Sequence, residues 1–166
     1  MNRSFGGMPV KIKVEKIAKY DEETDTIRLC APVSPSQNLL NSWISNRRFS
    51  TMKKFRKDTL DHLKLQAIVA LGTGYPRPWA QFAELTIIRC SETNRRLDRG
   101  NIIGGAKTTI DCLQIKFGGG RHWFQGAGLI VEDTDDHLKI VKAENRPMGE
   151  HKDLDVGTWL FLKRIR

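Results

Sequence analysis

The sequence predicts a single α+β domain in which a mixed, largely antiparallel sheet packs against two main helices. The chain has 166 residues, 39% of them hydrophobic, which is enough to bury a core without disulfides or metal ions. Segments that alternate like strands and segments with helical periodicity interleave along it. They lack the regular strand–helix–strand spacing of a parallel sheet, which favours the α+β class. Residues 1–27 are expected to be an N-terminal extension that adds a strand or hairpin to a main domain, residues 28–166.

The first part of the chain predicts two strands and a loop. Apolar and charged residues alternate from Val10 to Ile17, as in a half-buried strand. Residues 21–25 form an acidic cluster typical of a turn, and residues 27–33 predict a second strand that could complete a hairpin. Two prolines and the serines around them then predict a loop that ends near Asn38.

A long helix is expected over residues 50–70, with Ser50 or Thr51 as its N-cap. Four apolar residues fall near one another on the helical wheel of this segment: Met52, Phe55, Leu63 and Ala67.

The second half of the chain predicts a strand over residues 79–90 and a second helix over residues 101–113. The buried stripe of that helix would comprise Ile103, Ala106, Ile110 and Leu113. A glycine-rich loop or hairpin is expected at residues 117–126. Further strands are expected at residues 129–132, 137–141 and 157–165.

The charge of the chain indicates a polyanionic partner. The formal net charge is +9, which favours nucleic acid or an acidic membrane surface through long-range attraction. The densest group of cations, here called the basic cluster, could contact DNA phosphates or could be the solvated face of an amphipathic helix. It consists of Arg47, Arg48, Lys53, Lys54, Arg56 and Lys57.

Several functional classes find no support in the sequence. The three cysteines and four histidines are scattered, so no structural zinc site is indicated. The glycine run at 118–120 lacks the lysine and serine of a nucleotide-binding P-loop, and no serine or cysteine has a partnered base in a known motif. The N-terminus lacks the apolar core of a secretory signal, and no apolar run reaches the roughly 20 residues that span a bilayer. We expect a cytoplasmic protein with no membrane partner and no nucleotide cofactor.

Acidic residues near the ends of predicted elements suggest a divalent-metal site. Asp98, Glu132 and Asp133 carry oxygen ligands of the kind that Mg²⁺ prefers, although acids at turns are more often simply solvated. In phosphodiester hydrolysis, a metal ion polarises the phosphate and lowers the pKa of an attacking water. Magnesium is the expected cofactor, and manganese could replace it.

The order of motifs from Arg89 to Leu138 resembles the RusA family of Holliday junction resolvases, particularly its phage-borne members. The matching segments are Leu97-Asp98-Arg99-Gly100-Asn101, then Lys107, Asp111-Cys112-Leu113 and Gly128-Leu129-Ile130-Val131-Glu132-Asp133. The family's N-terminal Pro-Ser-x-Asn loop is echoed by Pro35-Ser36-Gln37-Asn38, followed by the basic cluster. The resemblance covers roughly residues 29–141.

The resemblance implies a role for each matching residue. Asp98 and Asp133 would be metal-ligating carboxylates, with Glu132 as neighbour, and Lys107 would steady the scissile phosphate or the leaving group. Asn101 could cap the following helix and orient the site. Asp111 is four residues after Lys107 and could hold that lysine through an i, i+4 pair, although an ordinary exposed ion pair has the same spacing. DNA contacts would come from Asn38, Arg47, Arg48, Lys53, Lys54, Lys57 and Arg121.

The chain departs from the family pattern in two places. The second acid of the family's Asp-x-Asp-Asn motif is Gly100 here, and Arg99 adds a positive charge beside it. Either Glu132, Asp135 or Asp136 supplies the missing oxygen, or the site binds DNA without cutting it. Residues 114–125 also lengthen the usual link before the Gly-Leu-Ile-Val segment.

Within that longer link, residues 116–124 mix glycines, cations and aromatic side chains. Aromatic side chains on a flexible hairpin can stack on bases opened at a junction. Alternatively, Phe117, Trp123 and Phe124 could pack on the core.

Three hypotheses follow from the sequence. The first is a homodimeric, metal-dependent, structure-selective endonuclease that resolves four-way or related branched DNA by symmetric nicking, since two symmetric nicks need two sites related by a two-fold axis. The second is a protein of the same fold that binds branched or duplex DNA and does no chemistry. The third is an RNA-binding or ribosome-associated basic protein, which the charge permits but the acidic motif does not explain.

Overall fold

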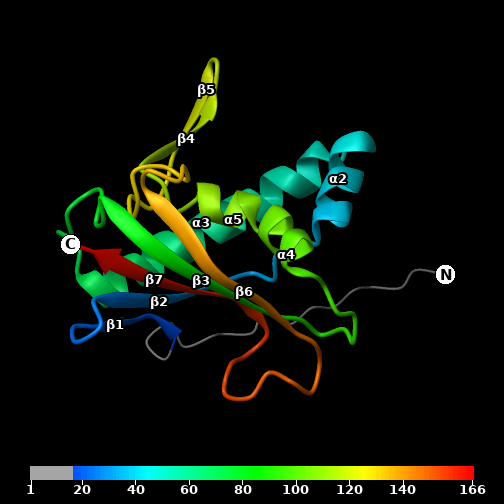
Figure 1. Cartoon of the computed structure of the whole chain (residues 1–166). Helices are drawn as coiled ribbons and strands as arrows, with labels where there is room; N and C mark the ends of the chain where they lie inside the picture. The colour runs from blue at the N-terminus through cyan, green and yellow to red at the C-terminus, as the bar shows by residue number, and fades with distance from the viewer. Residues whose placement is uncertain (1–16) are drawn as a thin grey trace.

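A five-stranded mixed sheet forms the centre of the molecule, and the helices lie over one of its faces (Figure 1). The computed structural model describes residues 17–166. The strand order is β1-β2-β7-β3-β6, and every neighbouring pair is antiparallel except β3 and β6. The predicted α+β class with a mixed, mostly antiparallel sheet is therefore confirmed. The strands of this sheet are β1 (Lys19–Asp21), β2 (Thr26–Ala31), β3 (Phe82–Cys90), β6 (Leu138–Arg146) and β7 (Gly157–Ile165).

Four helices and a separate two-stranded hairpin complete the described part of the chain. The hairpin projects from the body of the molecule, as Figure 1 shows. Its strands are β4 (Lys116–Gly119) and β5 (His122–Gln125), and the helices are α2 (Gln37–Ser45), α3 (Phe49–Leu71), α4 (Arg99–Gly105) and α5 (Lys107–Asp111).

The acidic turn at residues 21–25 joins two antiparallel strands, as predicted, but the first of them is β1. The strand expected from Val10 to Ile17 lies outside the described residues, apart from Ile17 itself, which precedes β1.

Helix α3 occupies nearly the predicted span and covers the sheet with its C-terminal half. Leu63 and Ala67 are fully buried, whereas Met52 and Phe55 are half-buried near the other end. The buried Gln66 binds β2 through both ends of its amide: the Cys30 N–H donates to its Oε1 at 2.7 Å, and its Nε2 donates to the Cys30 carbonyl at 2.6 Å. The predicted cap was wrong, because the helix begins at Phe49 and places both Ser50 and Thr51 inside its first turn.

The loop predicted to end near Asn38 is shorter than expected, because helix α2 begins at Gln37. Ser36 is its N-cap, and the Ser36 hydroxyl accepts a hydrogen bond from the Leu39 N–H at 3.2 Å. Asn38 therefore lies on the first turn of a helix that the sequence analysis did not predict.

The helix predicted over residues 101–113 is divided into α4 and α5 at Ala106. At this junction Gly105 packs against the segment before α2: a Cβ atom on Gly105 would lie 1.9 Å from the Pro35 carbonyl oxygen. Only glycine fits such a close approach between backbones. Ala106, Ile110 and Leu113 are buried as predicted, but Ile103 is half-buried and its neighbour Ile102 takes the core position.

Residues 129–132 do not form the predicted strand. Ile130 is fully buried and makes isolated bridges to Ala80 and to Gln114. The next predicted strand is present as β6, which is longer than expected and runs parallel to β3. The last predicted strand, residues 157–165, coincides with β7.

Candidate active site and nucleic-acid interface

Three of the predicted site residues meet at one point. The Lys107 ammonium donates hydrogen bonds to Asp111 Oδ1 at 2.6 Å and to Asp133 Oδ2. We call Lys107, Asp111 and Asp133 the lysine cluster. The side chain of Lys107 is 53% exposed, and those of Asp111 and Asp133 are each 27% exposed. The i, i+4 pair expected from the spacing of Lys107 and Asp111 is thus confirmed, and it gains a second carboxylate from a segment 26 residues away in sequence.

Partial burial sets the electrostatics of this cluster. Burial alone would lower the pKa of Lys107, but its hydrogen bonds with Asp111 and Asp133 outweigh that effect and raise the pKa above its usual value. For Asp111, burial has a larger effect on the pKa than the hydrogen bond with Lys107 has. Burial raises the pKa of its carboxyl group although Lys107 opposes the change, and the Gln114 amide donates to the same oxygen at 3.3 Å. The lysine is therefore held protonated between two carboxylates.

The lysine cluster separates two clefts. The first has a volume of about 580 Å³ and lies between α2, the α4–α5 segment and the start of β6. The second, of about 480 Å³, lies between α5 and the β4–β5 hairpin. Lys107 and Asp133 line both clefts, so a molecule bound in either one would meet the ammonium group and a carboxylate.

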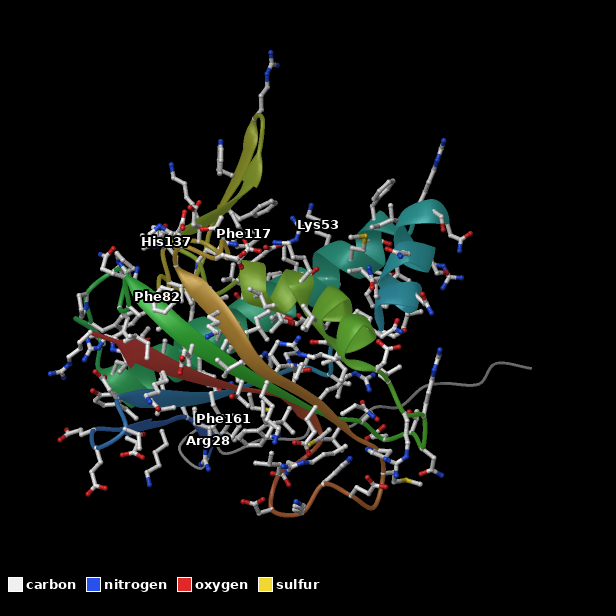
Figure 2. The ribbon with its side chains drawn as sticks, viewed as in Figure 1. Arg28, Lys53, Phe82, Phe117, His137 and Phe161 are labelled. Carbon is white, nitrogen blue, oxygen red and sulfur yellow. The ribbon has the colours of Figure 1, made fainter. Side chains whose placement is uncertain are left out.

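Glu132 lies on the wall of the second cleft, next to Asp133. Its Oε1 accepts a hydrogen bond from the Thr134 hydroxyl at 3.2 Å and is 3.8 Å from His137 Nε2. Figure 2 shows His137 and Phe117 near the foot of the hairpin, on the same side of the sheet as Lys53 of α3. Asp135 lines the first cleft.

Asp98 is not part of the lysine cluster. It is the N-cap of α4, and its two carboxylate oxygens accept hydrogen bonds from the backbone N–H of Asn101 at 2.9 Å and from the Asn101 side-chain amide at 2.8 Å. These hydrogen bonds lower the pKa of Asp98. Asp98 is also not among the residues that line the two clefts. The expectation that Asn101 caps the helix is reversed, since Asn101 donates to the capping carboxylate.

The two unusual residues beside Asp98 have defined positions. The Arg99 guanidinium donates to the carbonyl oxygen of Ile140 on β6 at 2.9 Å. A Cβ atom on Gly100 would have one close neighbour, Asp98 Oδ1 at 3.4 Å, so the backbone leaves room for a side chain there. Position 100 therefore has room for an acidic side chain, and steric crowding does not explain why the chain has glycine there.

The residues present fit a divalent cation only in part. Among the side chains that the structure describes, no three from His, Cys, Asp or Glu are gathered closely enough to hold a metal ion together. Two carboxylates, Asp111 and Asp133, do converge on one cation, the Lys107 ammonium. Magnesium at phosphoryl-transfer sites commonly takes one or two protein carboxylates and completes its shell with water and phosphate oxygens. The lysine cluster matches a magnesium site with two protein carboxylates, and the described residues add no third protein ligand to it.

The basic cluster spans the α2–α3 connection and the first turns of α3, and five of its six side chains are exposed. Lys57 is paired with Asp61 at 2.7 Å, and the guanidinium of the half-buried Arg56 lies 4.6 Å from the ring centre of Phe124 on the hairpin. This last contact links α3 to β5. Arg121 is exposed at the tip of the hairpin. Asn38 lines a separate hollow together with Arg89 and Arg95.

Helix α2 contributes a wall of the first cleft that was not predicted from the sequence. Gln37, Leu40 and Asn41 line that cleft opposite the lysine cluster. A signal for this helix was present, because Ser36 has the character of an N-cap and precedes apolar residues at helical spacing.

Comparison of the chain with models of protein families, with curated proteins and with solved structures found no match. The resemblance to the RusA family therefore remains an interpretation of the motif order. In the part of the chain that the structure describes, no helix combines the length and the apolar character needed to cross a membrane.

Proposed function

We propose that the protein is a structure-selective, metal-dependent endonuclease that nicks branched DNA. The observation that carries this proposal is the lysine cluster, in which a protonated lysine and two carboxylates stand between two clefts on the side of the sheet that carries the basic cluster. Phosphodiester hydrolysis needs a cation to stabilise the phosphate charge and an acidic group to hold a metal ion, and this cluster offers both.

Each residue of the cluster has a distinct task in this proposal. Lys107 stabilises negative charge on the phosphate, for which its raised pKa keeps it protonated. Asp133 and Asp111 would hold Mg²⁺ or Mn²⁺, with Glu132 on the same cleft wall. The metal ion would supply an activated water and polarise the phosphate.

The proposed DNA contacts surround these clefts. Cations of the basic cluster and Arg121 would bind phosphates, which gives affinity without base specificity. Two symmetric nicks at a four-way junction require two active sites, so the proposal includes a homodimer.

A second candidate function, binding of branched or duplex DNA without cleavage, is favoured by three observations. Asn101 donates hydrogen bonds to Asp98, position 100 lacks a carboxylate, and the described side chains include no set of three that could hold a metal ion. The basic surface would serve both functions equally.

Both candidates are tested with a labelled four-way DNA junction incubated with the protein in Mg²⁺, in Mn²⁺ and in EDTA. The endonuclease gives paired symmetric nicks that require metal and disappear in Asp133→Asn. Tight binding of the junction in EDTA, without nicks in either metal, establishes the binding protein. A preference for single-stranded RNA over the junction contradicts both and supports an RNA-binding protein.

A further inference from the structure

The hairpin formed by β4 and β5 has two unlike faces. Its strands pair Phe117 with Phe124 and Gly118 with Trp123. A turn of two residues, Gly120 and Arg121, joins them, with a φ of +62° at Gly120 that suits glycine. Because neighbouring residues of a strand point to opposite faces, the Phe117–Phe124 pair and the Gly118–Trp123 pair lie on different sides of the hairpin.

The phenylalanine face anchors the hairpin to the body of the protein. Phe117 is buried in the main core and stacks on Phe124 with ring centres 5.4 Å apart. The guanidinium of Arg56 lies over Phe124 and connects the hairpin to α3. The hairpin is thus attached at its base by an aromatic pair and a cation–π contact.

The opposite face presents a tryptophan with little around it. Trp123 is 59% exposed, and its cross-strand partner Gly118 has no side chain that could cover the ring. The ammonium of Lys116 lies 5.4 Å from the ring centre. Trp123 and Lys116 also line the second cleft together with Lys107, Asp111 and Asp133. The exposed indole and the lysine cluster are therefore parts of one concave surface.

We propose that Trp123 is a stacking platform for an unpaired nucleobase of branched DNA, and that Lys116 and Arg121 bind the phosphates beside it. This inference rests on the proposed function and specifies its substrate as DNA with an unpaired nucleotide at the branch point. A base stacked on Trp123 lies in the cleft that holds the lysine cluster, so the nucleotide's backbone is brought toward Lys107.

The dimensions and the charge of the hairpin favour a nucleobase over an apolar protein partner. The apolar surface on this face is one indole ring opposite Gly118, which matches a single flat base and is small for a protein interface. Two cations, Lys116 and Arg121, are exposed on the same hairpin, and the net charge of the chain is +9. Aromatic stacking combined with phosphate-binding cations is how proteins hold unpaired nucleotides.

The test measures DNA binding in EDTA, so that cleavage plays no part. The probes are a junction carrying 2-aminopurine as an unpaired nucleotide at its branch point and a fully paired duplex of equal length. We expect Trp123→Ala to weaken binding of the branched probe by about tenfold or more while duplex binding changes by less than about twofold. Stacking on the indole should quench 2-aminopurine fluorescence, and Trp123→Ala should abolish this quenching. Trp123→Phe should restore most of both effects.

The matched control is Met148→Ala, which removes another large exposed apolar side chain from the β6–β7 loop, at the opposite end of the molecule from the hairpin (Figure 1). It should change neither measurement. If the wild-type protein binds both probes and Trp123→Ala weakens them equally or not at all, the stacking inference is wrong and the proposed function stands. If the wild-type protein binds no DNA, both fail.

Discussion

Asp98 and Asp133 are both acidic residues of the motif, but they have different partners. Asp98 is exposed at the start of α4 and is hydrogen-bonded by its own neighbour Asn101. Asp133 is half-buried, lines two clefts and is paired with a lysine that also holds Asp111. One carboxylate stabilises the start of a helix and the other faces a space that a ligand can enter. Acids that look equivalent in a motif can therefore differ in whether they are available for chemistry.

The largest expected effect is a difference in nicking activity between variants of these two carboxylates. Asp133→Asn should reduce nicking of a four-way junction by about 100-fold or more, because it removes a proposed metal ligand and a partner of Lys107. Asp98→Asn should reduce nicking far less, because asparagine is also a good N-cap and Asp98 lies outside the lysine cluster. Single-turnover nicking rates in Mg²⁺ measure both. Equal losses of nicking in the two variants would indicate that Asp98 belongs to the active site.

A second comparison concerns the stability of two i, i+4 ion pairs. Lys107→Met leaves two half-buried carboxylates without their cation and should lower the free energy of unfolding by about 1–2 kcal/mol, between the values for exposed and buried pairs. Lys57→Met breaks an exposed pair with Asp61 and should have no measurable effect. Urea unfolding of both variants provides the measurement. A loss in Lys57→Met as large as that in Lys107→Met would show that burial is not what distinguishes the pairs.

The contribution of Lys107 should depend on alkaline pH. Because its pKa is raised above 10.5 in the folded protein, its stabilisation is fully present below pH 10.5 and is lost as the pH rises through the folded-state pKa. The stability difference between the wild-type protein and Lys107→Met should therefore shrink above about pH 10.5. Unfolding curves at pH 8 to 11.5 would reveal this, and a constant difference would argue against a charged pair.

The smallest expected effect is a difference in pKa between two carboxyl groups, those of Asp98 and Asp111. Hydrogen bonds from Asn101 lower the pKa of Asp98 below 3.8, whereas burial raises the pKa of Asp111 above 3.8. The Asp98 contribution to stability is thus present above pH 3.8 and lost as the pH falls through its folded-state pKa. Asp111 has the opposite effect on stability: the free energy of unfolding decreases as the pH rises from 3.8 through the raised pKa of Asp111. Carboxyl ¹³C NMR titration should find Asp111 titrating at the higher pH of the two.

Local patterns predicted those parts of the structure that local contacts determine. Strand β7 matches the predicted strand at residues 157–165, and the Lys107–Asp111 pair follows from helical spacing. The division between α4 and α5 could not be predicted, since it accompanies the packing of Gly105 against Pro35, about 70 residues earlier in the chain. Residues 129–132 are apolar enough for a strand, but their partners Ala80 and Gln114 allow only isolated bridges.

The candidate site was predictable to a similar extent. The sequence and the resemblance together identified Lys107, Asp111 and Asp133, which the fold brings into contact. The role of Asp98 as the N-cap of α4 was missed, because the helix was expected to begin at residue 101 and begins at Arg99. The α2 wall of the cleft was missed because the prolines before Ser36 favoured a loop.

The amide of Gln66 has a consequence for self-association. Cys30 lies beyond the last residue of β2 that pairs with β1, and Gln66 satisfies both its N–H and its carbonyl group from α3. An unpaired strand edge can recruit a strand from another molecule and so begin aggregation. Once α3 has packed on the sheet, the Gln66 side chain is hydrogen-bonded to the backbone N–H and carbonyl groups that an incoming strand would need. Gln66→Leu should therefore increase aggregation during refolding by more than its effect on stability would explain.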